Sequence, residues 1–195
     1  MHSTVSLKRR DQQQISTQTF ENLQPYESML NFMDEAVQAI QKNMAPEQIW
    51  FLEHEPVFTL GTSAKESDVI NAKDIPTIQT GRGGQVTYHG PGQLVAYLMI
   101  DLKARKMDLK AYVWTLEEAI INTLKTFEIQ GFRREGRVGI WVPESPTRDL
   151  KIAALGVRIQ KWVTSHGLAL NIDNDLNPYD QIVPCGIKGH GVTNI

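Results

Sequence analysis

One stretch of this 195-residue chain constrains the fold more than any other, an apolar strand followed closely by an amphipathic helix. Residues 85–101 read as a turn between two strands, and LVAYLMI at 94–100 predicts that the second strand is central in a sheet. Asp108 is a suitable N-cap, apolar residues recur at helical spacing over 109–127, and Gly131 is expected to end the helix. A long helix between groups of strands favours an α/β protein.

Other patterns supply a second helix and more strands. Residues 25–44 begin with Pro25, a good first-turn residue, and carry apolar side chains at helical spacing. Further strands are expected at 49–61 (two short strands broken at Pro56), 138–142, 151–159 and 166–172. Their hairpin-like spacing predicts a mixed, largely antiparallel sheet packed with helices.

The pattern indicates one domain preceded by a tail. No repeat or Pro/Gly/Ser-rich linker divides the chain, so a single domain is expected over residues 21–195. Residues 1–20 are polar and predict a mobile N-terminal tail, with an organelle transit peptide as the alternative.

Composition excludes several classes of function. The chain has 20 Lys plus Arg against 22 Asp plus Glu, so its formal charge of −2 lacks the basic footprint of a nucleic-acid-binding protein. No run of about 18 apolar residues is present to cross a membrane. The single cysteine excludes a disulfide framework and a zinc site built on several thiolates, and it favours a reducing, cytoplasmic location. His54 and Glu55 are adjacent rather than at ligand spacing, so no metal is expected.

A glycine-rich segment is the first candidate binding element. Its glycines fall within twelve residues, at positions 81, 83, 84, 90 and 92. Such density lets the backbone approach a ligand or take positive φ, but the spacing matches neither a Walker loop nor a dinucleotide fingerprint. Two tight turns flanking a strand would explain the glycines alone. The donors Arg82, Tyr88 and His89 favour a ligand pocket instead.

Cys185 is the candidate nucleophile, since Pro184 and Gly186 favour a fixed, exposed turn. At a usual pKa near 8.5 only about 3% of a free thiol is thiolate at pH 7, so catalysis needs a base or a cation nearby. The candidates for that role are Lys151, Lys188, His166, His190 and His89. An ammonium within about 4 Å would favour the thiolate by up to about 4 kcal/mol at an effective dielectric constant of 20.

Taken together, these motifs resemble the lipoyl/octanoyl transferase family. The matching blocks occur in family order at 53–61, 82–102, 138–142, 151–159, 166–172 and 184–195. RGGQVTYHGPGQ is highly specific, and KIAALGVR, HGLALN and PCGI make an accidental match very improbable. The resemblance implies the α/β fold shared with biotin and lipoate protein ligases. The chain stops ten residues after Cys185, where family members usually continue, so the domain is expected to be C-terminally short.

The resemblance also implies roles for individual residues. Cys185 matches the nucleophile that carries the acyl thioester, and Lys151 matches the lysine that lowers the pKa of that thiol and transfers protons. Three segments match the substrate-binding residues: Arg82, Gly83, Gly84, Gln85, Val86, Thr87, Tyr88 and His89; Ala154, Leu155 and Gly156; and Gly167, Leu168 and Ala169. We further expect Tyr88, Leu168 and the 94–98 strand to form an apolar slot for the acyl tail.

The implied reaction moves an octanoyl group from acyl carrier protein to a lysine of a lipoyl domain. The implied acceptors are lipoyl domains of 2-oxoacid dehydrogenase complexes and the glycine cleavage H protein. A thioester is already activated, so no ATP, metal or other cofactor is expected. Arg133, Arg134, Arg137 and Lys188 could form a basic docking patch for acidic partners. The alternatives are a lipoate or biotin ligase that adenylates a free acid, an amidotransferase acting between lipoyl proteins, and a non-catalytic acyl-binding module.

Overall fold

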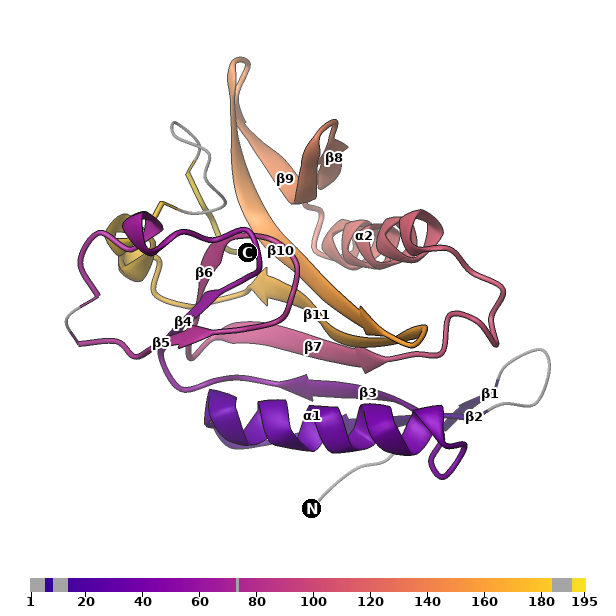
Figure 1. Cartoon of the computed structure of the whole chain (residues 1–195). Coiled ribbons are helices and arrows are strands. Elements are labelled where there is room, and N and C mark those ends of the chain that lie inside the picture. Colours follow the sequence, from indigo (N-terminus) through magenta and orange to yellow (C-terminus); the bar gives the residue numbers. More distant parts are fainter. Residues whose placement is uncertain (1–5, 9–13, 73, 184–190) are drawn as a thin grey trace.

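The computed structural model describes residues 6–8, 14–72, 74–183 and 191–195. Within them, an eight-stranded sheet in the order β1-β2-β3-β7-β11-β10-β9-β8 and a three-stranded sheet in the order β5-β4-β6 accompany two long helices (Figure 1). The large sheet comprises β1 (Ser6–Lys8), β2 (Gln14–Thr19), β3 (Glu47–Leu52), β7 (Gln93–Met99), β8 (Phe132–Arg134), β9 (Arg137–Ser145), β10 (Arg148–Gln160) and β11 (Val163–Asn171). The other elements are α1 (Tyr26–Gln41), α2 (Leu109–Thr126), β4 (Val57–Leu60), β5 (Thr77–Gln79), β6 (Val86–His89) and the 3-10 turns η1 (Glu66–Asp68) and η2 (Asn177–Gln181).

The large sheet is antiparallel at every pairing except β2 with β3, which confirms the predicted mixed, largely antiparallel sheet packed with helices. Its longest strand, β10, forms a hairpin with β11, and the turn residues Lys161 and Trp162 both have positive φ, at 49° and 71°. Two consecutive left-handed residues make a turn whose twist matches that of the strands. The hairpin places residues 154–156 directly beside residues 167–169.

The two helices cover opposite faces of the large sheet. Along β7, Val95, Tyr97 and Met99 pack with α1, whereas the intervening Ala96 and Leu98 pack with residues of α2. This alternation follows from the two-residue period of a strand, and both faces of β7 are therefore buried. The sequence-based prediction of a central strand at 94–100 is confirmed.

The predicted helix starts are confirmed, but one predicted end is wrong. Pro25 immediately precedes α1, and the carboxylate of Asp108 accepts a hydrogen bond of 2.7 Å from the Ala111 N–H at the start of α2. Helix α2 ends at Thr126 rather than at Gly131, because Glu128 takes the left-handed conformation that terminates the helix (φ 60°). Gly131 is instead required for packing, since a Cβ there would lie 2.7 Å from Leu124 Cδ1.

The N-terminal region also differs from the mobile tail expected over residues 1–20. Residues 14–19 form β2, which pairs in parallel with β3 from Ile15↔Glu47 to Thr19↔Phe51. Phe20 continues this segment and packs edge-on against Trp50, with ring centroids 5.9 Å apart. The polar composition of QISTQT suits a strand near the sheet edge that satisfies the backbone groups of β3.

Candidate active site

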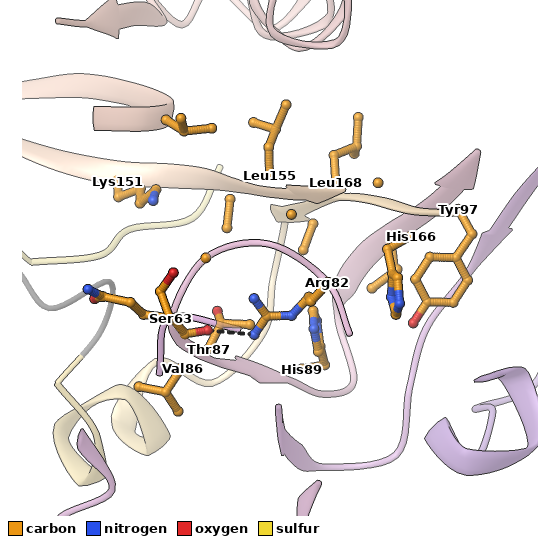
Figure 2. A pocket seen from close by; sticks show the side chains of 18 of the residues that line it. Ser63, Arg82, Val86, Thr87, His89, Tyr97, Lys151, Leu155, His166 and Leu168 are labelled. Atoms are coloured by element: carbon orange, nitrogen blue, oxygen red, sulfur yellow. Dashed lines mark hydrogen bonds between the residues drawn. The ribbon is translucent and has the colours of Figure 1, made fainter. Parts of the chain in front are cut away.

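A cavity of about 260 Å³ lies between the β10–β11 hairpin and the glycine-rich segment (Figure 2). The residues singled out from the sequence that line it are Arg82, Gly84, Gln85, Val86, Thr87, His89, Val95, Tyr97, Arg137, Lys151, Ala154, Leu155, Gly156, His166, Gly167, Leu168 and Ala169. Gly83 and Tyr88 lie outside the lining. The Tyr88 ring packs instead with Phe58 and Tyr179 in the core of the small sheet, so it does not form the expected acyl slot.

The two short predicted segments meet as cross-strand neighbours. Leu155 pairs with Leu168 and Gly156 pairs with Gly167. The leucine side chains point to the face of the sheet that α2 covers, as Figure 2 shows, and they pack in the core there. The expectation that the Leu168 side chain forms the slot is therefore wrong, because strand alternation turns it away. Ala154, Ala169 and Val95 contribute to the apolar lining instead.

Glycine is required where the glycine-rich segment docks on the hairpin. The Gly83 N–H donates to the Val157 carbonyl at 3.1 Å. A Cβ on Gly156 would lie 2.9 Å from the Gly83 carbonyl. On the neighbouring strand, a Cβ on Gly167 would lie 2.2 Å from the carbonyl of Ala96 in β7. These approaches set the backbone walls of the cavity.

Arg82 holds the glycine-rich segment in place. Its side chain is buried, and Nη2 donates to the Thr59 carbonyl at 2.7 Å, to Thr59 Oγ1 at 2.8 Å and to the Gln85 carbonyl at 2.8 Å. Nη1 donates to the Gly83 carbonyl at 3.0 Å. A planar guanidinium serves several carbonyls at once in a way that an ammonium does not. The arginine predicted as a binding residue therefore also shapes the wall.

Lys151 lines the cavity opposite the glycine-rich segment and is 9% exposed. Its Nζ lies 5.5 Å from the centre of the Trp141 ring. Its backbone pairs with the last described segment, since the Lys151 N–H donates to the Gly191 carbonyl and the Thr193 N–H donates to the Lys151 carbonyl, both at 3.0 Å. Cys185, Lys188 and His190 lie outside the described residues, so the predicted meeting of Cys185 with Lys151 stays a prediction.

Beyond Arg82, the cavity meets a cluster of buried rings formed by Tyr26, His54, His89, Tyr97 and His166. His54 Nδ1 donates to the Gln24 carbonyl at 2.9 Å, and Nε2 accepts from the Tyr97 hydroxyl at 2.6 Å. His89 Nδ1 lies 2.7 Å from Gln93 Oε1, to which it donates. The sequence considered alone indicated His89 as a pocket donor or a base and His166 as a base. It did not indicate the cluster, because the members are spread along the chain without a common spacing.

Burial keeps the histidines of this cluster neutral. Loss of hydration lowers the pKa of His54 to about 4, opposed by its hydrogen bond to the Gln24 carbonyl. Burial, reinforced by the positive charges of Arg82 and Arg158, lowers the pKa of His166 to about 3. Burial also holds the pKa of His89 well below its usual value. At neutral pH the three rings are therefore uncharged dipoles rather than cations.

Two residues of the expected basic patch, Arg133 and Arg134, are neutralised within the protein. Arg133 contacts Glu117 at 3.0 Å and Glu118 at 2.8 Å, and its guanidinium lies over the Trp114 ring. Arg134 is paired with Asp149. Because these carboxylates already balance the charges, a basic surface built on Arg133 and Arg134 is not supported.

Neither a metal centre nor a membrane-spanning helix is found in the described residues. Within the parts of the chain that the structure describes, no group of three or more His, Cys, Asp or Glu side chains is arranged to hold a metal ion. In the same residues, no helix is both long and apolar enough to span a membrane.

Comparisons with known proteins agree with this architecture. The family model of the lipoyl protein ligase A/B catalytic domain matches residues 25–195. An octanoyltransferase of Paramagnetospirillum magneticum is 52% identical over 170 residues, covering 87% of this chain and 80% of the relative. An octanoyltransferase of Brucella melitensis biotype 1 is 50% identical over 183 residues, covering 90% of this chain and 69% of the relative.

A solved structure shares the fold at low sequence identity. The bipartite lipoate protein ligase of Thermoplasma acidophilum superposes with a TM-score of 0.65 at 17% identity, covering 91% of this chain and 73% of the ligase. The expected biotin/lipoate ligase-like α/β fold is therefore confirmed. The chain belongs to the family of the lipoyl protein ligase A/B catalytic domain.

Proposed function

We propose that this protein transfers an octanoyl group from octanoyl-acyl carrier protein to a lysine of lipoyl domains through a thioester on Cys185. Two relatives that are 52% and 50% identical are named octanoyltransferase. The observation that carries the proposal is the position of Lys151, which lines the cavity and is hydrogen-bonded through its backbone to Gly191 and Thr193. Gly191 follows Cys185 by six positions in the chain.

In the proposed first step, the Cys185 thiolate attacks the thioester carbonyl carbon. A bond forms from Cys185 Sγ to the acyl carbon, and the bond from that carbon to the carrier sulfur breaks. The carrier leaves as a thiolate and takes up a proton from the Lys151 ammonium, which becomes a neutral amine. The Lys151 ammonium favours the attacking thiolate electrostatically, and its low exposure strengthens that effect because water screens it less.

In the proposed second step, the neutral amine of the acceptor lysine attacks the acyl-enzyme. A carbon–nitrogen bond forms, the carbon–sulfur bond breaks, and the amine loses a proton. The neutral Lys151 amine accepts this proton and becomes an ammonium again, and Cys185 leaves as a thiolate. Backbone N–H groups of the cavity wall are the proposed donors to the tetrahedral oxyanion, since such donors stabilise charge as it develops.

No ATP, metal or other cofactor enters this scheme, because the thioester supplies the driving force for amide formation. The proposed acceptors are lipoyl domains of 2-oxoacid dehydrogenase complexes and the glycine cleavage H protein. Neither nucleic acid nor a membrane has a role, and the proposed location is the cytoplasm. A ligase of the same fold would require ATP and a free acid, which gives the experiment a clear contrast.

Intact-protein mass spectrometry tests the proposal. Mixing the protein with octanoyl-acyl carrier protein should add one octanoyl group, and adding a lipoyl domain should move it to the domain. Cys185→Ser should abolish the adduct on residue 185, and Lys151→Ala should slow its formation by about a hundredfold or more. Octanoate with ATP and magnesium should give no product. An adduct that requires ATP, or transfer that survives Cys185→Ser unchanged, would overturn the proposal.

A further inference from the structure

The cavity has two chemically different ends. Figure 2 shows Lys151 at one side of the cavity and the rings of His166 and Tyr97 at the other. Val157, the residue of β10 that pairs with His166, lies six positions after Lys151. Between these two positions, Ala154 and Gly156 of β10 line the cavity. A chain whose reacting carbon lies near Lys151 would therefore extend toward His166.

The far end of the cavity is a fixed wall of rings. The His166 and Tyr97 rings meet edge to face, with centroids 5.9 Å apart and planes at 89°. The Tyr97 hydroxyl is held by His54 at 2.6 Å, and the Tyr26 ring stacks on His89 with centroids 5.9 Å apart. Because these contacts tie the wall to α1 and to β6, it cannot yield by a simple side-chain rotation.

His166 has two features that folding alone would not favour. It adopts φ 58° within β11, a left-handed conformation that side chains other than glycine rarely take, and its N–H reaches Met33 Sδ at 3.0 Å. Its Nδ1 is buried without a hydrogen-bond partner among the described residues. Strained backbone and unpaired buried polar atoms concentrate at functional positions.

We infer that His166, backed by Tyr97, is a specificity-determining residue that limits the length of the acyl chain this enzyme accepts. This inference rests on the proposed function and names a determinant within it. A methyl end can rest against the edge of the neutral imidazole. A longer chain must displace the ring from its contact with Tyr97, and this is unfavourable in a packed interior. The neutral state of His166 fits contact with an apolar chain end.

Replacing the wall residue tests the inference. His166→Gly removes the ring and suits the positive φ, so the backbone has no reason to rearrange. In the variant, the ratio of kcat/KM for decanoyl- over octanoyl-acyl carrier protein should rise about tenfold, the contribution of two additional buried methylenes. Leu124→Ala is the control, because Leu124 is buried on the α2 side and outside the lining. It should lower stability and leave the ratio unchanged.

Calorimetry measures the binding of free octanoic and decanoic acid. The ratio of the two affinities reports the chain length that the cavity accommodates, whether or not transfer occurs. His166→Gly should strengthen decanoate binding relative to octanoate binding by a similar factor. If both ratios stay at their wild-type values, His166 does not limit chain length and the inference fails. If the wild-type protein transfers no octanoyl group but His166→Gly still shifts the ratio of decanoate to octanoate binding, the proposed function fails, whereas the role of His166 in limiting the length of the cavity is supported.

Discussion

Gly139 and Lys151 lie so close that a Cβ on the glycine would be 2.4 Å from Lys151 Cε and 3.0 Å from Lys151 Nζ. Gly139 has φ 122°, which also requires glycine. The pairing of β9 with β10 is irregular between Lys151 and Ala153, next to this contact. Gly139 therefore provides the space in which the lysine side chain enters the cavity.

Gly139→Ala should displace the Lys151 amine and lower kcat for acylation by about tenfold or more, since small misplacements of a reacting group are costly. Stopped-flow or quenched acylation assays with octanoyl-acyl carrier protein measure this. Gly136→Ala is the matched control, because Gly136 also lines the cavity with positive φ (72°), but nothing lies within 4 Å of the position that a Cβ would take. Equal losses in both variants would assign the effect to backbone strain instead of to Lys151.

Arg82→Ala should destabilise the protein by about 2–4 kcal/mol, because the buried carbonyl and hydroxyl oxygens of Thr59 lose a donor. The glycine-rich segment should also loosen and raise KM for the acyl donor. Urea denaturation and steady-state kinetics measure the two effects. Arg148→Ala is the control, since this exposed arginine pairs with Glu144 across the β9–β10 turn, in a surface contact worth about 0–1 kcal/mol. Wild-type stability of Arg82→Ala would contradict the role assigned to the guanidinium.

Acid should destabilise the fold through the buried histidines. Well above pH 6.5 both folded and unfolded histidines are neutral, and their contribution to stability is fully present. As the pH falls toward 4 for His54 and toward 3 for His166, the unfolded state takes up protons that the folded state excludes. Each group then lowers the free energy of unfolding by about 1.4 kcal/mol per pH unit at most.

Urea titrations at pH 7.0, 6.0 and 5.0 measure this slope. His54→Gln keeps a donor and an acceptor but does not titrate. The free energy of unfolding of this variant should therefore fall less steeply with decreasing pH than that of the wild type, by up to about 1.4 kcal/mol per pH unit, which corresponds to one proton. Parallel slopes for the wild type and the variant would show that His54 is protonated equally in both states.

Removal of residues 1–19 should lower the melting temperature by about 5 °C or more and promote self-association, because the edge of β3 loses its partner. Differential scanning calorimetry and light scattering measure the two effects. A truncation that stops before Ser6 is the control, since it leaves β1 and β2 whole. Unchanged melting and dispersity after removal of residues 1–19 would show that β2 adds no stability.

The sequence predicts elements best where local physics decides them. The Asp108 cap, the period of α2 and the apolar run of β7 each carry their own signal and are confirmed. The predicted end of α2 is wrong because Glu128 rather than a glycine takes the left-handed conformation. Strand β2 is not predicted because its polar sequence does not indicate a strand by itself. The strand is stabilised by pairing with β3.

For the site, the sequence indicates most of the segments that line the cavity but not how each side chain is oriented. Leu168 and Tyr88 carry apolar side chains in matching blocks, yet strand alternation directs the first toward α2 and the second into the small-sheet core. The meeting of Tyr97 with His166 depends on the pairing of β7 with β11, two strands far apart in the sequence. Only the assembled sheet brings these rings together.

The large sheet acts as a partition, with the cavity on the side of α1 and the helix α2 on the other. Exposed residues of α2 such as Trp114 can therefore change without altering the shape of the cavity. This separation lets evolution, or an engineer attaching a fluorophore or a surface tether, remodel one side of the molecule while the other keeps its chemistry.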